Sequence, residues 1–105
     1  MKRRLLLVLL FPLMPLKAQE PDIQCPGKNT IEMRWCASKA RNESREALKE
    51  KLSLEILEKW EQATKEACEV AYAPYLQGTI YPQMVATCDD RLNRALLEEL
   101  KGLGR

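Results

Sequence analysis

The chain has 105 residues, with 17 Lys+Arg, 15 Asp+Glu and no histidine. This length allows a single small domain. Without histidine, the chain lacks the usual general base of nucleophilic triads, the paired histidines of common zinc sites and the imidazole pH switch. We therefore predict a protein that is not an enzyme and that has no catalytic residue, metal site or cofactor.

Residues 1–18 have the pattern of a secretory signal peptide. A basic start at residues 2–4 precedes an apolar stretch at residues 5–16, and Ala18 is a suitable last residue before cleavage. The alternative is a membrane anchor, but a spanning helix needs about 20 apolar residues, and this shorter stretch contains two prolines. We predict an exported protein, periplasmic or secreted, without a stable membrane span.

Cleavage after Ala18 also changes the charge. It removes four of the 17 Lys+Arg and none of the 15 Asp+Glu, so 13 basic residues remain against 15 acidic ones and the net charge becomes −2. The positive balance of the full chain therefore gives no support for binding to nucleic acid, and we expect no such partner.

The remaining chain begins with an irregular segment and continues as a first helix. Residues 19–28 contain two prolines and Gly27 and show no period. Asn29 followed by Glu32 is a start that resembles a capping box. Beyond it, small or apolar residues recur at steps of three and four, which predicts one buried helix face: Met33, Ala37, Ala40, Ser44, Ala47, Leu48 and Leu52.

A second helical pattern runs from residue 54 to about residue 73, and its apolar face is expected to hold these residues: Leu57, Trp60, Ala63 or Thr64, Ala67, Cys68, Ala71 and Tyr72. Ser53 is the only candidate break between the two patterns. They could form a helical hairpin or one bent helix of over forty residues. We favour the hairpin, because the long helix would expose its apolar stripe.

A loop bracketed by Pro74 and Gly78 separates the second pattern from a third helix, in which Pro82 suits the first turn. The third helix is expected to direct these residues inward: Met84, Val85, Cys88, Leu92, Leu96 and Leu100. Asp89 and Asp90 are expected to be solvated, and Trp35 and Trp60 to be packing residues. The prediction is an all-α, disulfide-stapled bundle of three helices over residues 29–101, with a tail at residues 102–105.

Four cysteines in a short exported chain predict two disulfide bonds. A zinc site is disfavoured, because the chain has no C-x-x-C motif. Cys68 and Cys88 lie symmetrically about the predicted loop, but Cys36 and Cys68 lie equally well about the predicted hairpin turn, so both pairs remain possible. We favour Cys25–Cys36 together with Cys68–Cys88.

Several short motifs then follow one another in a fixed order. They are Cys25, Glu32-Met33-x-x-Cys36-Ala37, Leu48 with Leu52, Trp60 eight residues before Cys68, and Gly78-x-Ile80-Tyr81-Pro82 before Cys88 and Leu92. This order, over about residues 25–100, resembles the lysozyme inhibitor LprI-like N-terminal domain family. That family comprises small exported bacterial helical domains with four cysteines, and it takes its name from a member that inhibits lysozyme.

The chain departs from the family pattern on its first two helices. Arg45 stands where the family commonly has Asp, and Leu48-Lys49-x-x-Leu52 stands in place of Leu-Asn-x-x-Tyr. Leu57 replaces a Gln, and Ala63-Thr64 replaces Tyr-Arg. The stretch before Trp60 is shorter by about a dozen residues, which corresponds to about two turns in each arm of the hairpin. The chain therefore resembles a shortened variant of the family.

The resemblance implies a binding function, with lysozyme or another cell-envelope protein as the partner and docking at the active-site cleft of lysozyme as the mode. The predicted contact residues form one loop with aromatic anchors: Tyr75, Leu76, Gln77, Gly78, Thr79, Ile80 and Tyr81. Alternatively, the two tyrosines cap the core. The alternative function is a structural or small-ligand-binding secreted module without inhibitory activity, for which we would expect a sizeable apolar cavity between the helices.

Overall fold

The computed structural model describes residues 22–102, and these form an all-helical bundle. It consists of α2 (Thr30–Lys49), α3 (Leu54–Ala71), the short 3-10 helix η2 (Ala73–Tyr75) and α4 (Tyr81–Lys101). The predicted three-helix, disulfide-stapled fold is confirmed. The predicted signal peptide at residues 1–18 lies outside the described residues, as do the first residues of the irregular segment and most of the tail.

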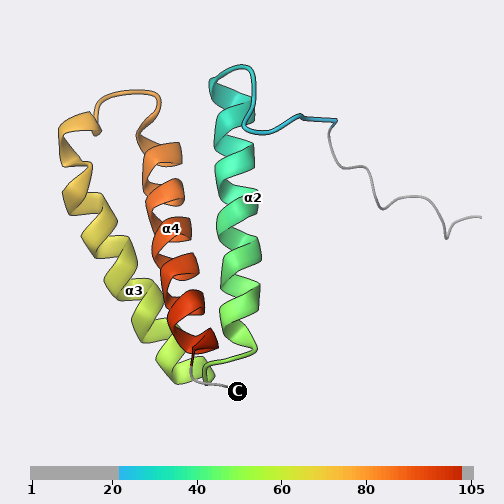
Figure 1. Ribbon diagram of the computed structural model, residues 1–105. Coiled ribbons are helices and arrows are strands. Elements are labelled where there is room, and N and C mark those ends of the chain that lie inside the picture. Colours follow the sequence, from blue (N-terminus) through green and yellow to red (C-terminus); the bar gives the residue numbers. More distant parts are fainter. Residues whose placement is uncertain (1–21, 103–105) are drawn as a thin grey trace, which may run out of the picture.

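The position of α4 organises the bundle. Helices α2 and α4 run in the same direction, α3 runs in the opposite direction, and α4 lies between the other two in Figure 1. The contact between α2 and α4 is the most extensive, α3 and α4 share a smaller one, and α2 and α3 contact each other least. The two arms of the predicted hairpin are thus held together largely through the third helix.

The turn between the first two helices confirms the hairpin over a single bent helix. α2 ends at Lys49 and α3 begins at Leu54. Ser53 is the N-cap of α3, and its Oγ accepts a hydrogen bond of 3.3 Å from the N–H of Ile56. A serine at this position stabilises a helix start by about 1 kcal/mol. The chain can therefore turn here without a glycine or a proline.

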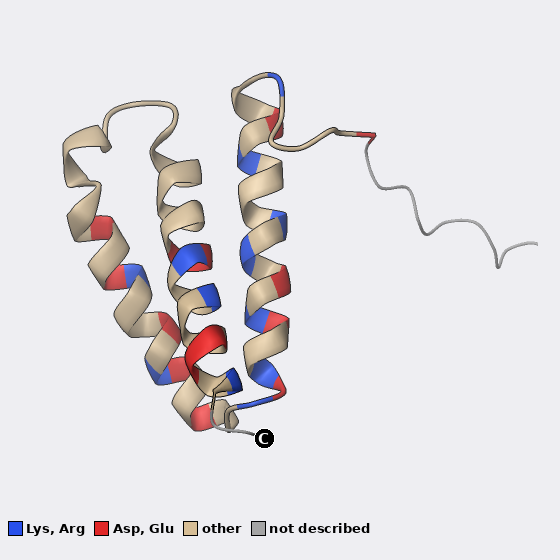
Figure 2. Cartoon of the chain, in the orientation of Figure 1, with Lys and Arg blue, Asp and Glu red and all other residues tan. Residues whose placement is uncertain are grey.

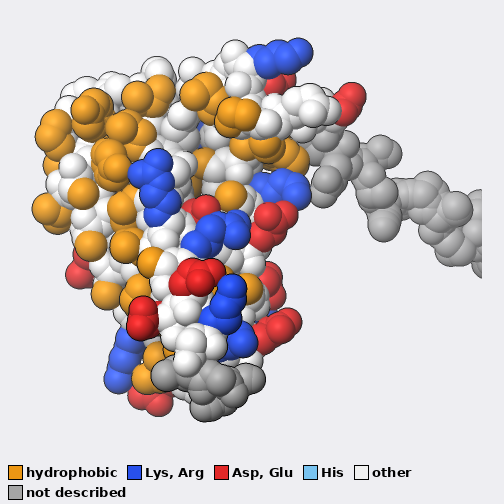
Figure 3. Space-filling view, viewed as in Figure 1, with side chains coloured by type: hydrophobic (Ala, Val, Ile, Leu, Met, Phe, Trp, Pro, Cys, Tyr) orange, Lys and Arg blue, Asp and Glu red, His pale blue; other side chains and the backbone are white. Residues whose placement is uncertain are grey.

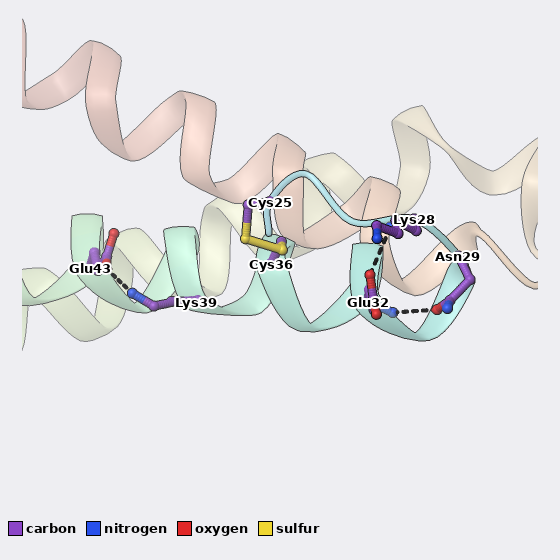
Figure 4. The surroundings of a disulfide bond; sticks show 7 residues. All are labelled: Cys25, Lys28, Asn29, Glu32, Cys36, Lys39 and Glu43. Carbon is purple, nitrogen blue, oxygen red and sulfur yellow. Dashed lines mark hydrogen bonds and ion pairs between the residues drawn. A yellow bond between two sulfur atoms is a disulfide. The ribbon is translucent and has the colours of Figure 1, made fainter. Parts of the chain in front are cut away.

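The start of α2 has the predicted cap, with one change of partner (Figure 4). Asn29 Oδ1 accepts a hydrogen bond of 2.9 Å from the N–H of Glu32. The Glu32 carboxylate accepts one of 2.9 Å from the N–H of Lys28, one residue earlier than in a standard capping box. Gly27 has a φ of +103°, and a Cβ there would lie 2.6 Å from the backbone N of Met33, so only glycine fits.

The two disulfide bonds are the pairs that the sequence favoured. Cys25–Cys36 joins the segment before α2 to that helix, with an S–S distance of 2.05 Å (Figure 4). Cys68–Cys88 joins the end of α3 to the first half of α4, with an S–S distance of 2.14 Å. Both lie toward the end of the bundle at which α2 and α4 begin and α3 ends (Figure 1).

The core contains few buried apolar residues: Cys36, Leu48, Leu57, Cys68 and Ala86. The inward faces predicted for the first two helices are confirmed at Ser44, Leu48, Leu57, Thr64 and Cys68. On α3 the prediction was wrong at Ala67 and Ala71, which are exposed. On α4 the prediction was wrong in register. Its predicted inward residues are only half-buried, and the buried ones are Ala86, Asp89 and Asn93. Because α4 packs against both α2 and α3, the row that it buries faces the space between those helices. We call Asp89 and Asn93, the polar members of this row, the polar row.

The expectation of a solvated Asp89 is therefore wrong, since this side chain is only 8% exposed. It lies on the row of α4 that faces both neighbouring helices. Asp90, one residue further on, is half-buried and forms an ion pair of 2.9 Å with Arg94. The dipole of the helix start, which motivated the prediction for both residues, does not determine which side of the helix meets a neighbour.

A chain of hydrogen bonds crosses the bundle through the polar row. Trp60 Nε1 in α3 donates to Asn93 Oδ1 in α4 at 2.7 Å, and Asn93 Nδ2 donates to Ser44 Oγ in α2 at 3.0 Å. The Ser44 hydroxyl donates to the Arg41 carbonyl at 3.1 Å. Both groups of the Asn93 amide thus have partners, one on each neighbouring helix, as a buried amide requires.

We expect Asn93→Ala to lower the free energy of unfolding by about 2 kcal/mol, because it removes two hydrogen bonds and leaves Trp60 Nε1 and Ser44 Oγ without their partner. Asn42→Ala, the same change at an exposed position of α2, is the matched control and should change it by less than about 0.5 kcal/mol. Urea unfolding followed by circular dichroism measures both. Equal stability of the two variants would show that the network contributes nothing.

The disulfide pairing predicts the pattern of a tryptic digest made without reduction. Residues 66–91 contain no Lys or Arg before Arg91, so Cys68 and Cys88 stay in one peptide, while Cys36 is released in residues 35–39. Mass spectrometry should find residues 35–39 joined to the peptide that ends at Lys28, and residues 66–91 with an internal disulfide. A product of three joined peptides would contradict the pairing.

Candidate functional site

The predicted contact segment, residues 75–81, closes the disulfide-bonded end of the bundle between η2 and α4. It is held by consecutive turns, in which the N–H groups of Tyr75, Leu76 and Gly78 donate to carbonyls three residues earlier, at 2.9 to 3.0 Å. From α2, Arg34 Nη2 donates to the Thr79 carbonyl at 3.3 Å. With Cys68–Cys88 at its base, the segment has a defined shape.

The structure places six of the seven predicted contact residues at the surface: Tyr75, Leu76, Gln77, Gly78, Thr79 and Ile80. Tyr81, in the first turn of α4, is half-buried. Tyr75 is 48% exposed, and the centroid of its ring lies 6.2 Å from that of Tyr72. Of the two tyrosines that could cap the core, Tyr81 is therefore partly covered, whereas Tyr75 extends the exposed surface.

The end of α3, the loop and the start of α4 are free of charged residues, whereas the start of α2 beside them carries Lys28, Glu32 and Arg34. Residues 70–87 contain no Asp, Glu, Lys or Arg, and Figure 2 shows this stretch as the uncharged ends of α3 and α4 with the loop between them. Hydrophobic side chains gather over the same region in Figure 3. We call the exposed residues Val70, Tyr75, Leu76 and Ile80 the apolar pole.

Val70 is 76% exposed and was missed by sequence reasoning, which confined the contact surface to the loop. Val70 precedes the loop and lies in the last turn of α3. The absence of charged residues from 70 to 87 is the sequence signal that would have added Val70 to the predicted contact surface. Contiguous exposed apolar surface of sufficient area marks sites of interaction, which makes the apolar pole the candidate contact surface.

A second feature is a cavity of about 270 Å³ with lining residues from all three helices. Arg41 and Arg45 come from α2, Glu61, Thr64 and Lys65 from α3, and Asp89 and Asn93 from α4. Arg45 and Glu61 form an ion pair across the cavity's edge. The space between the helices is therefore lined by charged and polar groups and is unlike the apolar cavity expected of the alternative function.

The electrostatics of this cavity centre on Asp89. Burial raises the pKa of its carboxyl above the ordinary value of 3.8. The charge of Arg41, a hydrogen bond from the Thr64 hydroxyl and the charge of Lys65 each lower this pKa in part, while the charge of Glu69 raises it. Asp89 Oδ1 is buried and accepts no hydrogen bond from the described residues. Sequence reasoning missed the cavity because it needs three helices to form.

Another hollow, open to solvent and of about 650 Å³, lies over the outer side of α2. It is bordered by Trp35, Lys39 and Glu43, among others. Trp35 is half-buried, with Lys39 Nζ 6.0 Å from the centroid of its ring. Of the two tryptophans expected to pack, Trp60 also hydrogen-bonds to Asn93, whereas Trp35 contributes to this open surface.

Comparisons with known proteins add no relative: no family model, no curated protein and no solved structure matches this chain. Across residues 22–102, no helix combines the length and the apolar character needed to cross a membrane. The same part of the chain contains no group of three His, Cys, Asp or Glu side chains that could hold a metal ion.

The raised pKa of Asp89 predicts a specific pH dependence of stability. The folded protein holds this proton more tightly than the unfolded chain, so Asp89 stabilises the fold most fully below pH 3.8, and this contribution is lost as the pH rises through the folded-state pKa. The asparagine side chain of the Asp89→Asn variant does not titrate, so the variant lacks this pH-dependent contribution. Its melting temperature relative to the wild type should therefore rise between about pH 3 and about pH 7.

Asp90→Asn is the control, because it removes the same charge from the next residue, where the carboxylate faces Arg94. Melting curves from circular dichroism, recorded for the three proteins across this pH range, give the comparison. If Asp89→Asn lost stability relative to the wild type as the pH rose, the assigned effect of burial would be wrong.

Proposed function

We propose that this protein is an exported helical binding protein, a shortened relative of the LprI-like domains, and that it inhibits lysozyme by docking its apolar pole at the active-site cleft. The observation that carries the proposal is the pole itself: an exposed, uncharged cluster with an aromatic anchor, held in a fixed shape at one end of the bundle. The family resemblance supplies the target.

The rigidity of the pole supports a role in binding. Binding costs free energy for every loop and side chain that becomes ordered, and a surface that is already ordered avoids much of this cost. Here the turns of residues 75–81, the hydrogen bond from Arg34 and the disulfide Cys68–Cys88 fix the backbone before any partner arrives. Tyr75 is also a residue type that is enriched at the centres of interfaces.

The distribution of charge also supports docking through the apolar pole. An uncharged contact surface loses no ionic hydration when it is buried, whereas burying unpaired charges costs several kcal/mol. On α3 and α4 the charged residues lie outside residues 70–87 (Figure 2), and after loss of residues 1–18 acidic residues outnumber basic ones. Lysozyme has a cationic surface, so this balance would favour its approach without placing charges in the contact itself.

To test the proposal, we would titrate the purified, oxidised protein into lysozyme while following the lysis of cell walls by turbidity. The wild type should slow lysis at micromolar concentration. Leu76→Ala should weaken inhibition about tenfold, because an apolar anchor at an interface centre contributes over 1 kcal/mol. Leu76 is 57% exposed, so the matched control is Leu54→Ala, which removes a leucine that is 60% exposed at the opposite end.

Two results would count against the proposal. If the wild type, with its helical content confirmed, did not slow lysis at micromolar excess, lysozyme would be excluded as the target. If Leu76→Ala and Leu54→Ala weakened inhibition equally, the contact surface would lie elsewhere than at the apolar pole. Circular dichroism of both variants ensures that the comparison is made between folded proteins.

A further inference from the structure

The cavity between the three helices contains an arrangement of charges that the apolar pole does not use. Asp89 is 8% exposed, its Oδ1 has no hydrogen-bond donor among residues 22–102, and the cavity reaches this residue. A buried polar atom without a partner costs about 1 to 3 kcal/mol, and nearly all such atoms in native proteins are satisfied. Because Asp89 also lines the cavity, a ligand bound there could supply a donor to this carboxylate.

The cations around the cavity differ in how they are paired. Arg45 forms an ion pair with Glu61, and Lys65 forms one of 3.1 Å with Glu69. Arg41 forms no ion pair with any residue in the described part of the chain, although its charge acts on Asp89. Arg41 and Asp89 therefore present one cation and one anion to the same cavity without contacting each other directly.

These charges exclude ligands that carry a single charge. A simple cation would be attracted by the Asp89 carboxylate, but the positive charges of Arg41, Arg45 and Lys65 around the cavity would repel it. A simple anion would find Arg41 but would approach the carboxylates of Asp89 and Glu61. A molecule with both an ammonium group and a carboxylate satisfies both ends, since ionic hydrogen bonds contribute about 1.5 to 3 kcal/mol each.

We propose that this cavity binds a small zwitterion, an amino acid or a short peptide, whose ammonium group donates to Asp89 and whose carboxylate is bound by Arg41. The volume of about 270 Å³ agrees with this size. It corresponds to about nine water molecules at roughly 30 Å³ each, which is enough for an amino acid or a dipeptide, and it is below the range of pockets that hold larger organic ligands. The Asn93 amide, already bonded to Trp60 and Ser44, fixes the adjacent wall.

The test is a titration of the ¹⁵N-labelled, oxidised protein, followed by NMR. L-alanine and L-alanyl-L-alanine are the probes, and propionate and ethylammonium are the controls, because each keeps only one of the two charged groups. We expect at least one zwitterion, at millimolar concentration, to cause saturable shifts of amide signals around Arg41, Thr64 and Asp89. The two singly charged compounds should cause none.

Two variants connect the binding to the proposed groups. Asp89→Asn keeps the shape of the side chain and removes its charge, and it should raise the Kd about tenfold or more, as should Arg41→Gln. Asp90→Asn, which removes a carboxylate that pairs with Arg94 outside the cavity, should bind as the wild type does. The amide spectra of the variants also report whether each is folded.

The proposal would be overturned by any of three results: no saturable shift with either zwitterion, binding of propionate as strong as that of L-alanine, or unchanged binding by Asp89→Asn. None of these results depends on lysozyme or on the apolar pole, so this proposal and the proposed function can fail separately.

Discussion

The side-chain amide of Asn93 is the interaction on which the packing of the three helices depends. Its oxygen and its nitrogen bond to different helices, Trp60 in α3 and Ser44 in α2, so it fixes the rotation of α4 relative to both. Apolar contacts are not directional and would allow α4 to rotate or slide. A core with so few buried apolar side chains therefore needs a directional interaction to specify one arrangement.

The central position of α4 explains why polar side chains are buried between the helices. A helix that packs against two others must present a narrow row to the space between them, and here that row contains Asp89 and Asn93. Asn93 satisfies both of its groups, whereas Asp89 does not. These two residues lie one turn apart on the same helix but differ in role. Asn93 holds the helices together, whereas Asp89 faces the cavity.

Much of the fold could be predicted from the sequence because its signals are local. Helical periodicity, the Asn29 cap and the loop around Gly78 all depend on neighbours in the chain. The predicted helix layout favoured the observed cysteine pairing but also allowed Cys36–Cys68. The burial of Asp89 could not be predicted in this way, because it depends on where α4 sits between two distant helices. The apolar pole was predicted in part. Its loop was identified from the sequence, but the exposure of Val70 depends on how α3 ends in the structure.

The disulfide Cys68–Cys88 connects the two surfaces. It forms the base of the loop that presents Tyr75 and Leu76, and it also fixes the helix segments that line the cavity, since Thr64 lies one turn before Cys68 and Asp89 directly follows Cys88. α3 and α4 have a smaller contact than α2 and α4, so this bond provides a large part of the constraint between them. Cys25–Cys36, by contrast, attaches the segment before α2 to a helix that is already packed along α4. The geometry of both surfaces therefore depends on the oxidised state of the second disulfide more than on that of the first.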